Sequence, residues 1–150
     1  MNYSKSILMS ISLLLSSWAV ADLEPWSDYE VSDEVWSITT VKVHANMSDA
    51  YLEGIRDTWV QGQKTAMELG HIESFHIFRS DMEASGDFNM ILAVRFANDS
   101  MLTPNKERYE AMMDALGADE SQAATEQAQR DYPAMRDIVG EYRMREITLK

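Results

Sequence analysis

Four segments of the chain alternate between apolar and polar residues with the period of two that a half-buried β-strand produces. These segments are Val35–His44, Ile72–Arg79, Phe88–Phe96 and Glu141–Leu149. In the third segment one face is wholly apolar, with Phe88, Met90, Leu92, Val94 and Phe96. The other face is mixed, with Asn89, Ile91, Ala93 and Arg95. The first face suits a protein core, whereas the second is too apolar for a surface that meets only water.

Between these strands, apolar residues recur at the spacing of an α-helix. A first helix is predicted from Ser48, a good N-cap residue, to Leu69, with Gly70 at the C′ position. Gly62 falls on its apolar stripe, which predicts a close approach to a strand there. A second helix is predicted to start at Thr103-Pro104 and to stop at Gly117. Its apolar side is formed by Tyr109, Met112, Met113 and Leu116. Asp119–Asp131 is predicted to be a further surface helix, which Pro133 ends.

The predicted order of elements is β-α-β-β-α-β, the order of the ferredoxin-like α+β fold with a four-stranded antiparallel sheet. Right-handed crossovers place both helices on one face of the sheet, so its other face, called the open face below, is left uncovered. Alternation predicts that the first three strands contribute to this face Trp36, Ile38, Thr40, Lys42, His44, Ile72, Ser74, His76, Phe78, Asn89, Ile91, Ala93 and Arg95. In the last strand two assignments compete, Tyr142 with Met144 or Ile147 with Leu149.

An open face with Trp36, Ile38, Phe78 and Ile91 is a larger apolar patch than monomeric proteins usually expose. Pairing with a second copy, sheet against sheet about a two-fold axis, buries such a patch against itself. Polar groups that remain between the sheets would line a cavity, which is a typical setting for a ligand. The sequence therefore predicts a homodimer that holds a small, partly apolar ligand between its sheets.

The predicted order of elements is one part of a resemblance to a known family. Together with the helix end at Trp59–Gly70 running into HIESFHIFR and the closing EYRMREITLK, it resembles the dimeric α+β barrel superfamily over Val35–Lys150. Members of that superfamily include cofactor-independent monooxygenases, polyketide cyclases and haem-binding enzymes. The resemblance implies a fold and a dimer, and it implies no particular reaction, because fold and function separate easily in such groups.

The first residues have the features of a secretory signal peptide. Lys5 precedes an apolar run, Ile7–Trp18, and Ala19-Val20-Ala21 has the small-x-small form of a cleavage site. The run is shorter than the ~20 residues that span a bilayer. We therefore expect a signal peptide at 1–21, an N-terminal arm at 22–34 and a domain at 35–150. The mature protein would be periplasmic or secreted, without a stable membrane anchor.

Composition narrows the possible functions. The chain carries a net charge of −12, which repels phosphate backbones and argues against nucleic acid as a partner. It contains no cysteine, no G-x-S-x-G motif and no glycine-rich phosphate loop, so hydrolase and nucleotide-binding functions lose their usual support. His71 and His76 have opposite parity on a strand, so no metal site is predicted from them.

The open face holds the candidate chemistry. In an enzyme, His76 or His44 would act as the general base, and Arg95 or Asn89 would stabilise an oxyanion. Lys42 and Trp36 are further candidates for contact with a ligand. Arg95 has an alternative role, an ion pair with an acidic residue across the dimer. Three hypotheses follow: a binding protein, a cofactor-independent enzyme, and a haem protein using one histidine. No cofactor is predicted outright.

Overall fold

The computed structural model describes residues 22–82 and 86–150. The predicted signal peptide at 1–21 and part of the predicted loop, at 83–85, lie outside the described residues. The domain consists of the elements β2 Val35–Val43, α1 Ser48–Asp57, α2 Trp59–Glu68, β3 Ser74–Arg79, β4 Met90–Phe96, α3 Lys106–Leu116, α4 Ala118–Asp131 and β5 Arg136–Met144. Short 3₁₀ turns lie at Asp99–Leu102 and Tyr132–Ala134, and two short strands at Tyr29–Val31 (β1) and Ile147–Leu149 (β6).

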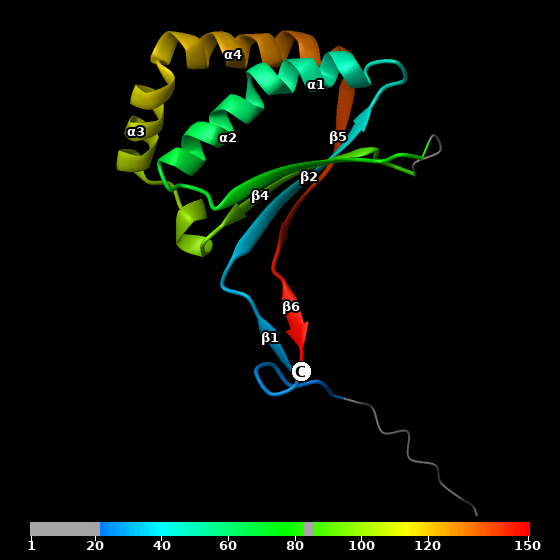
Figure 1. Cartoon of the computed structure of the whole chain (residues 1–150), viewed down its shortest axis with the longest axis vertical. Coiled ribbons are helices and arrows are strands. Elements are labelled where there is room, and N and C mark those ends of the chain that lie inside the picture. Colours follow the sequence, from blue (N-terminus) through cyan, green and yellow to red (C-terminus); the bar gives the residue numbers. More distant parts are fainter. Residues whose placement is uncertain (1–21, 83–85) are drawn as a thin grey trace, which may run out of the picture.

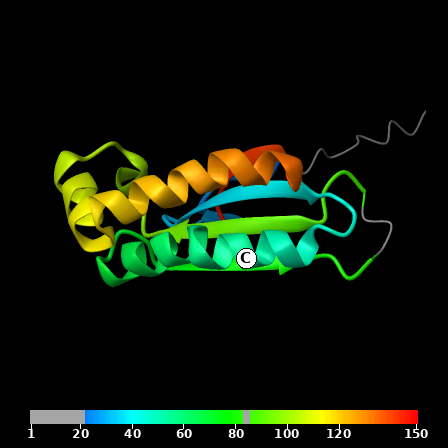
Figure 2. The same cartoon turned by 90° about the horizontal axis from the view of Figure 1, so that it is seen from above.

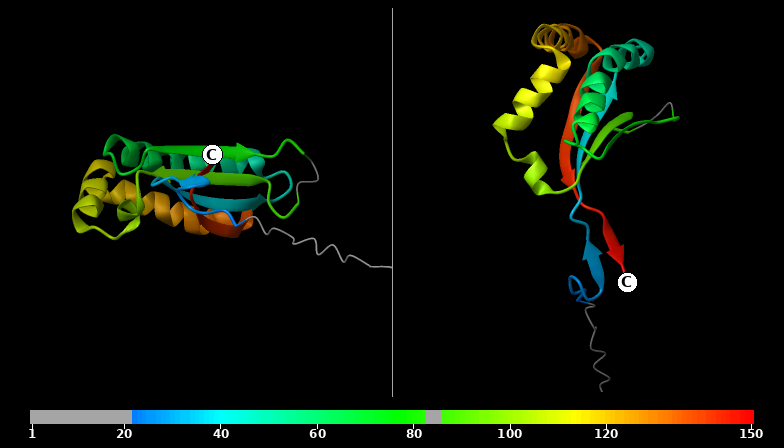
Figure 3. Two further views of the ribbon diagram at one scale, coloured as in Figure 1. Left: turned by 90° about the horizontal axis from the view of Figure 1, so that it is seen from below. Right: turned by 60° about the vertical axis from the view of Figure 1, so that its left-hand side comes forward.

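Four strands form one antiparallel sheet in the order β3-β4-β2-β5. Helices α1, α2 and α4 lie over the same face of this sheet, as Figures 1 and 2 show from two directions. The left view of Figure 3 looks at the molecule from the side on which no helix covers the sheet. The predicted ferredoxin-like α+β fold, with its one-sided helix layer, is therefore confirmed.

The core lies between the sheet and the helices. Strands β2 and β4 contribute Val41, Val43, Met90 and Leu92, each at most 9% exposed. Helix α1 contributes Tyr51 and Ile55, and the turn after α4 contributes Tyr132. The rings of Tyr51 and Tyr132 meet edge to face with centroids 5.4 Å apart. These strand residues are the odd-parity set of β2 and the even-parity set of β4 that alternation predicts.

The predicted first helix is broken into two at Thr58, whose backbone leaves the helical region with φ −120° and ψ −82°. The Thr58 hydroxyl donates a hydrogen bond to the Gly54 carbonyl oxygen over 2.9 Å and also bonds the Tyr132 hydroxyl. A threonine that bonds back to the carbonyl four residues earlier bends a helix. Helical periodicity passes through this point unchanged, so the prediction of one continuous helix was wrong there.

The predicted last strand is also two elements. β5 starts earlier than predicted, at Arg136, and ends at Met144. After Arg145 and Glu146, β6 pairs antiparallel with β1 from the N-terminal arm to form a two-stranded ribbon. This ribbon projects away from the domain and carries the C-terminus (Figure 1). The register of β5 with β2 places Tyr142 beside Ile38 and Met144 beside Trp36, which settles the assignment that the sequence left open.

Three smaller expectations are corrected. Phe88 precedes β4 and is 41% exposed, so it is not part of the core. Ile72 precedes β3 and is buried, so it does not belong to the exposed part of the open face. Helix α3 begins at Lys106 after Asn105, whose side chain accepts a hydrogen bond from the Arg108 amide over 2.8 Å. The capping asparagine, and not the Thr103-Pro104 pair, therefore sets this helix start.

The two glycines inside the α1–α2 pair have different surroundings. At Gly62 an added Cβ would meet only Met112 Cε, at 4.0 Å, so the predicted close approach to a strand is wrong. At Gly54 an added Cβ would lie 3.0 Å from Tyr132 Cε1. Gly54 therefore provides room for the buried ring of Tyr132, whereas Gly62 borders open space.

We expect Gly62→Ala to stabilise the protein by up to ~1 kcal/mol, because alanine has the higher helix propensity. Gly54→Ala should gain the same propensity and lose ~1–3 kcal/mol by crowding Tyr132. Urea unfolding of both variants at equal protein concentration measures the difference. Equal stabilisation by the two substitutions would show that the Tyr132 ring moves aside freely.

Candidate functional site

On the open face, residues that pair across neighbouring strands form rows that cross the sheet. Residues paired across antiparallel strands share a face, so each row can be read from the pairing. From β3 through β4 and β2 to β5, the rows are Ser74, Arg95, Trp36 and Met144; His76, Ala93, Ile38 and Tyr142; and Phe78, Ile91, Thr40 and Gly140. The predicted parity of the first three strands is confirmed for these residues.

A chain of side-chain contacts runs through all three of these rows. The Arg95 guanidinium carbon lies 5.8 Å from the Trp36 ring centroid. The Trp36 ring lies 5.8 Å from the His76 ring, and His76 stacks on Phe78 at 5.9 Å. Arg95 also forms an ion pair with Glu34 at 3.0 Å and donates a hydrogen bond to the Ser74 hydroxyl over 3.2 Å. Its acidic partner is thus found within its own chain.

Beside this chain of rings lies a shallow depression of about 410 Å³. Its lining is mostly apolar, and it consists of Trp36, Ile38, Phe78, Ile91, Ala93, Met144, Arg145 and Glu146. Phe78 is 53% exposed, and Tyr142 and Met144 are each 52% exposed. The open face of a single subunit therefore presents a wide apolar surface with charged groups at its margin.

Three of the predicted site residues lie together at the opposite end of β2. Lys42, His44 and Asn89 border a second depression, of about 710 Å³. The Asn89 amide is occupied by the backbone of Val43: its oxygen accepts from the Val43 amide over 2.7 Å, and its nitrogen donates to the Val43 carbonyl oxygen over 2.8 Å. The Lys42 ammonium donates to the Gly86 carbonyl oxygen over 2.9 Å. Asn89 and Lys42 thus have clear structural roles, and their predicted contact with a ligand stays a prediction.

His44 is held by two acceptors. Its Nε2 lies 3.0 Å from an Asp137 carboxylate oxygen, and its Nδ1 lies 3.2 Å from the Ala134 carbonyl oxygen. The hydrogen bond to Asp137, followed by the one to Ala134, raises the pKa of His44 above its ordinary value. His76 shares a row with Ile38, and His44 lies six residues farther along the same strand, a separation of about 20 Å at ~3.3 Å per residue. The two candidate bases therefore do not meet within one subunit.

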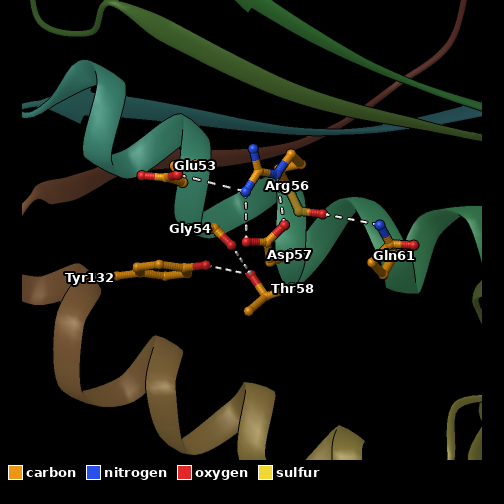
Figure 4. Close-up of polar contacts among 7 residues, drawn as sticks. All are labelled: Glu53, Gly54, Arg56, Asp57, Thr58, Gln61 and Tyr132. Atoms are coloured by element: carbon orange, nitrogen blue, oxygen red, sulfur yellow. Dashed lines mark hydrogen bonds and ion pairs between the residues drawn. The ribbon is translucent and has the colours of Figure 1, made fainter.

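A third hollow lies on the helix side of the sheet, and sequence patterns gave no sign of it. This helix-side cavity, of about 680 Å³, is lined by residues around the α1–α2 break, by α4, by Tyr132 and by Arg136. Figure 4 shows how the break places the Thr58 hydroxyl against Tyr132, with Asp57 beside Arg56. Tyr132 and Arg136 lie between the predicted helix that ends at Asp131 and the predicted last strand. The periodicity of apolar residues gives no information in that loop, so it did not indicate a role for either residue.

The part of the chain that the structure describes holds no group of three or more His, Cys, Asp or Glu side chains placed to bind a metal ion. Its helices are each too short or too polar to cross a membrane.

No protein-family model matches the chain, and no curated protein matches it. Solved structures similar to it include a NIPSNAP family protein of unknown function from Agrobacterium tumefaciens, with 14% identity and a TM-score of 0.49 over 82% of this chain and 95% of that one. HapK from Hahella chejuensis is 12% identical, with a TM-score of 0.45 over 75% of this chain and 91% of that one. A dimeric protein of unknown function with a ferredoxin-like fold, from Bacteroides fragilis, is 11% identical, with a TM-score of 0.38 over 81% of this chain and 100% of that one. These similarities stop at the general arrangement of the chain.

The contact between His44 and Asp137 predicts how the stability of the fold depends on pH. Because the folded-state pKa of His44 is raised, the pair stabilises the fold fully below the unfolded value of about 6.5 and loses its effect as the pH rises through the folded pKa. Asp137→Asn should lower the pKa of His44, measured from its imidazole proton resonances by NMR. Asp114→Asn removes the same charge elsewhere and should leave the resonances of His44 unchanged. An identical His44 titration in Asp137→Asn would contradict the assignment.

Proposed function

We propose that this protein is an exported homodimer that binds a small, partly apolar ligand between the open faces of its two sheets. The observation that carries the proposal is the apolar depression on the open face, bordered by Trp36, Phe78 and Ile91. Half-exposed Tyr142 and Met144 extend it to the edge of the sheet. A patch of this kind marks an interaction surface in soluble proteins.

A second copy is the occupant that suits this surface. A two-fold axis brings each open face against an identical one, so apolar side chains meet apolar side chains without a second type of partner. The depression of one subunit would then face that of the other, and the two would close into one cavity. Supporting this arrangement, Arg95 is already neutralised by Glu34, so burying it introduces no unpaired charge.

The lining sets the chemistry of the ligand. Aromatic and aliphatic side chains dominate the depression, while Arg145 and Glu146 lie at its margin. Arg145 is bound to the Ser32 and Asp33 carbonyl oxygens over 2.8 and 2.9 Å, and it also forms an ion pair with Asp99. Arg95 and Arg145 both have partners within the chain, so binding of the ligand would depend on apolar contacts. His76 would orient one polar group of the ligand. Small-molecule sites commonly combine an apolar lining with a few polar groups that fix orientation.

Export is proposed on the pattern of residues 1–21 alone. The absence of cysteine is compatible with a periplasmic domain that relies on its core for stability.

The enzymatic and haem hypotheses stay predictions. A general base is commonly oriented by a hydrogen-bonded partner. Among the described residues, the His76 ring makes stacking contacts with Trp36 and Phe78, and no hydrogen bond to its nitrogens is present. His44 has both nitrogens occupied by acceptors, which favours its protonated form and opposes the action of a base.

The proposal predicts that a charge on the open face separates the subunits. Ile91→Arg should convert a dimer into a folded monomer, because two arginines would meet across the two-fold axis. Ile138→Arg introduces the same side chain on β5 at a position that shares the helix-side face with Val41, and it should remain dimeric. Sedimentation equilibrium at micromolar concentration measures both masses.

Native mass spectrometry of the protein purified from its host tests the ligand. We expect a bound mass on the wild-type dimer and on Ile138→Arg that is missing from Ile91→Arg. A monomeric wild-type protein would refute the proposal, and so would the lack of any bound mass that Ile91→Arg loses.

A further inference from the structure

The helix-side cavity lies on the other side of the sheet from the open face, so a ligand there does not depend on dimerisation. Its walls come from the α1–α2 break, the end of α3 and one side of α4 (Figures 1 and 2). The apolar part of the lining consists of Trp59, Gly62, Leu116, Ala123, Ala124 and Ala128. A volume of about 680 Å³ falls within the usual range for small-molecule sites.

Small residues create this space. Gly62 faces the cavity, and an added Cβ there would meet nothing nearer than 4.0 Å. Across from it, α4 presents alanines where larger aliphatic residues would fill the gap. The alanines of α4 leave space between this helix and α2. The indole of Trp59 borders that space and also packs edge to face on the ring of Phe75.

One charged side chain in the cavity has unused hydrogen-bonding capacity. Arg136 lies over the ring of Tyr132, with its guanidinium carbon 5.7 Å from the centroid. Its Nε is buried and has no hydrogen-bond acceptor among the described residues. A buried donor without an acceptor is costly, and more so when it belongs to a charged group. Burial raises the pKa of neighbouring Tyr51, while the charge of Arg136 and a side-chain hydrogen bond with Arg136 act against that rise. Because its pKa is raised overall, Tyr51 stays neutral and does not balance the charge of Arg136.

The nearby hydroxyl groups cannot supply further donors. Thr58 uses its hydrogen on the Gly54 carbonyl oxygen, so the hydrogen between Thr58 and Tyr132 comes from Tyr132. Both hydroxyl hydrogens are then committed. The lining also includes Gln61, Thr125 and Gln127, which are neutral, so Arg136 is the cationic donor among the described lining residues. A carboxylate matches the paired N–H groups on one edge of a guanidinium.

The local charge also favours an anion. Asp57 is the carboxylate in the lining, and Arg56 binds both of its oxygens, over 2.7 and 2.9 Å. These hydrogen bonds hold the pKa of Asp57 below its ordinary value. The Asp57 charge is thus compensated, which leaves Arg136 as the charged side chain without an ion-pair partner among the described lining residues.

We infer that the helix-side cavity binds a small organic carboxylic acid with an apolar body. The carboxylate would accept hydrogen bonds from the guanidinium of Arg136, which lines the cavity. The apolar body would lie between Trp59 and the alanines of α4.

The test uses 4-phenylbutanoate as the probe, with its neutral amide, 4-phenylbutanamide, and acetate as comparisons. Isothermal titration calorimetry on the full mature chain measures each dissociation constant. We expect the acid to bind at least tenfold more tightly than the amide and than acetate. Failure of the acid to bind at millimolar concentration, or binding equal to that of either comparison compound, overturns the inference.

Variants locate the site. Arg136→Met should abolish the preference for acid over amide, and Arg136→Lys should retain part of it. Gly62→Leu should block both compounds by filling the cavity. Ile91→Arg, on the open face, should bind the acid as the wild type does, which separates this inference from the proposed dimer. Acid binding that survives both Arg136→Met and Gly62→Leu would place the site elsewhere and refute the inference.

A structural readout accompanies the binding data. Without ligand, Arg136→Met should unfold at an equal or higher urea concentration than the wild type, because it removes a partly buried charge whose Nε has no acceptor among the described residues. With saturating 4-phenylbutanoate, the wild type should gain stability and Arg136→Met should not. A gain of the same size in Arg136→Met would contradict the role of the guanidinium.

Discussion

The structure depends on one constraint: the helices cover a single face of a four-stranded antiparallel sheet. Every side chain of β2 and β4 must therefore serve either the covered core or the open face, and alternation along the strand decides which. Val41, Met90 and Leu92 fill the core for this reason. Trp36, Ile38 and Ile91 lie on the open face for the same reason, and their apolar character is the basis of the proposed interaction surface. The open-face depression and the helix-side cavity therefore lie on opposite sides of the same sheet.

Alternation allowed a good part of the fold to be predicted, because parity is a local property. The β-α-β-β-α-β order and the rows through Arg95 with Trp36 and through Ala93 with Ile38 follow from the spacing of apolar residues. Parity does not fix distance along a strand, however. His44 and His76 share a face and lie about 20 Å apart, because His44 follows the end of β2 whereas His76, on β3, lies in the row of Ile38 near the middle of β2.

What the sequence did not predict comes from contacts between distant residues. The break at Thr58 depends on the Tyr132 hydroxyl, 74 positions later in the chain. The amide of Asn89, expected to meet a ligand, completes the hydrogen bonding of Val43 on another strand. The ring of Tyr132 and the guanidinium of Arg136 acquire their roles only when the turn after α4 reaches the core. No periodic pattern records such pairings, so the helix-side cavity had no signal in the sequence.

The ribbon of β1 and β6 joins Tyr29–Val31 to Ile147–Leu149, which are almost the first and the last described residues. It is fastened by Lys150, whose ammonium lies 2.9 Å from the Glu30 carboxylate and donates to the Trp26 carbonyl oxygen over 2.7 Å. A pairing across so much of the chain has a high contact order, and it cannot begin before synthesis reaches the final residues. A two-stranded ribbon is also marginally stable alone. The ribbon is therefore the segment that we expect to close last during folding and to open first under mild denaturation, so the two chain ends would be released together.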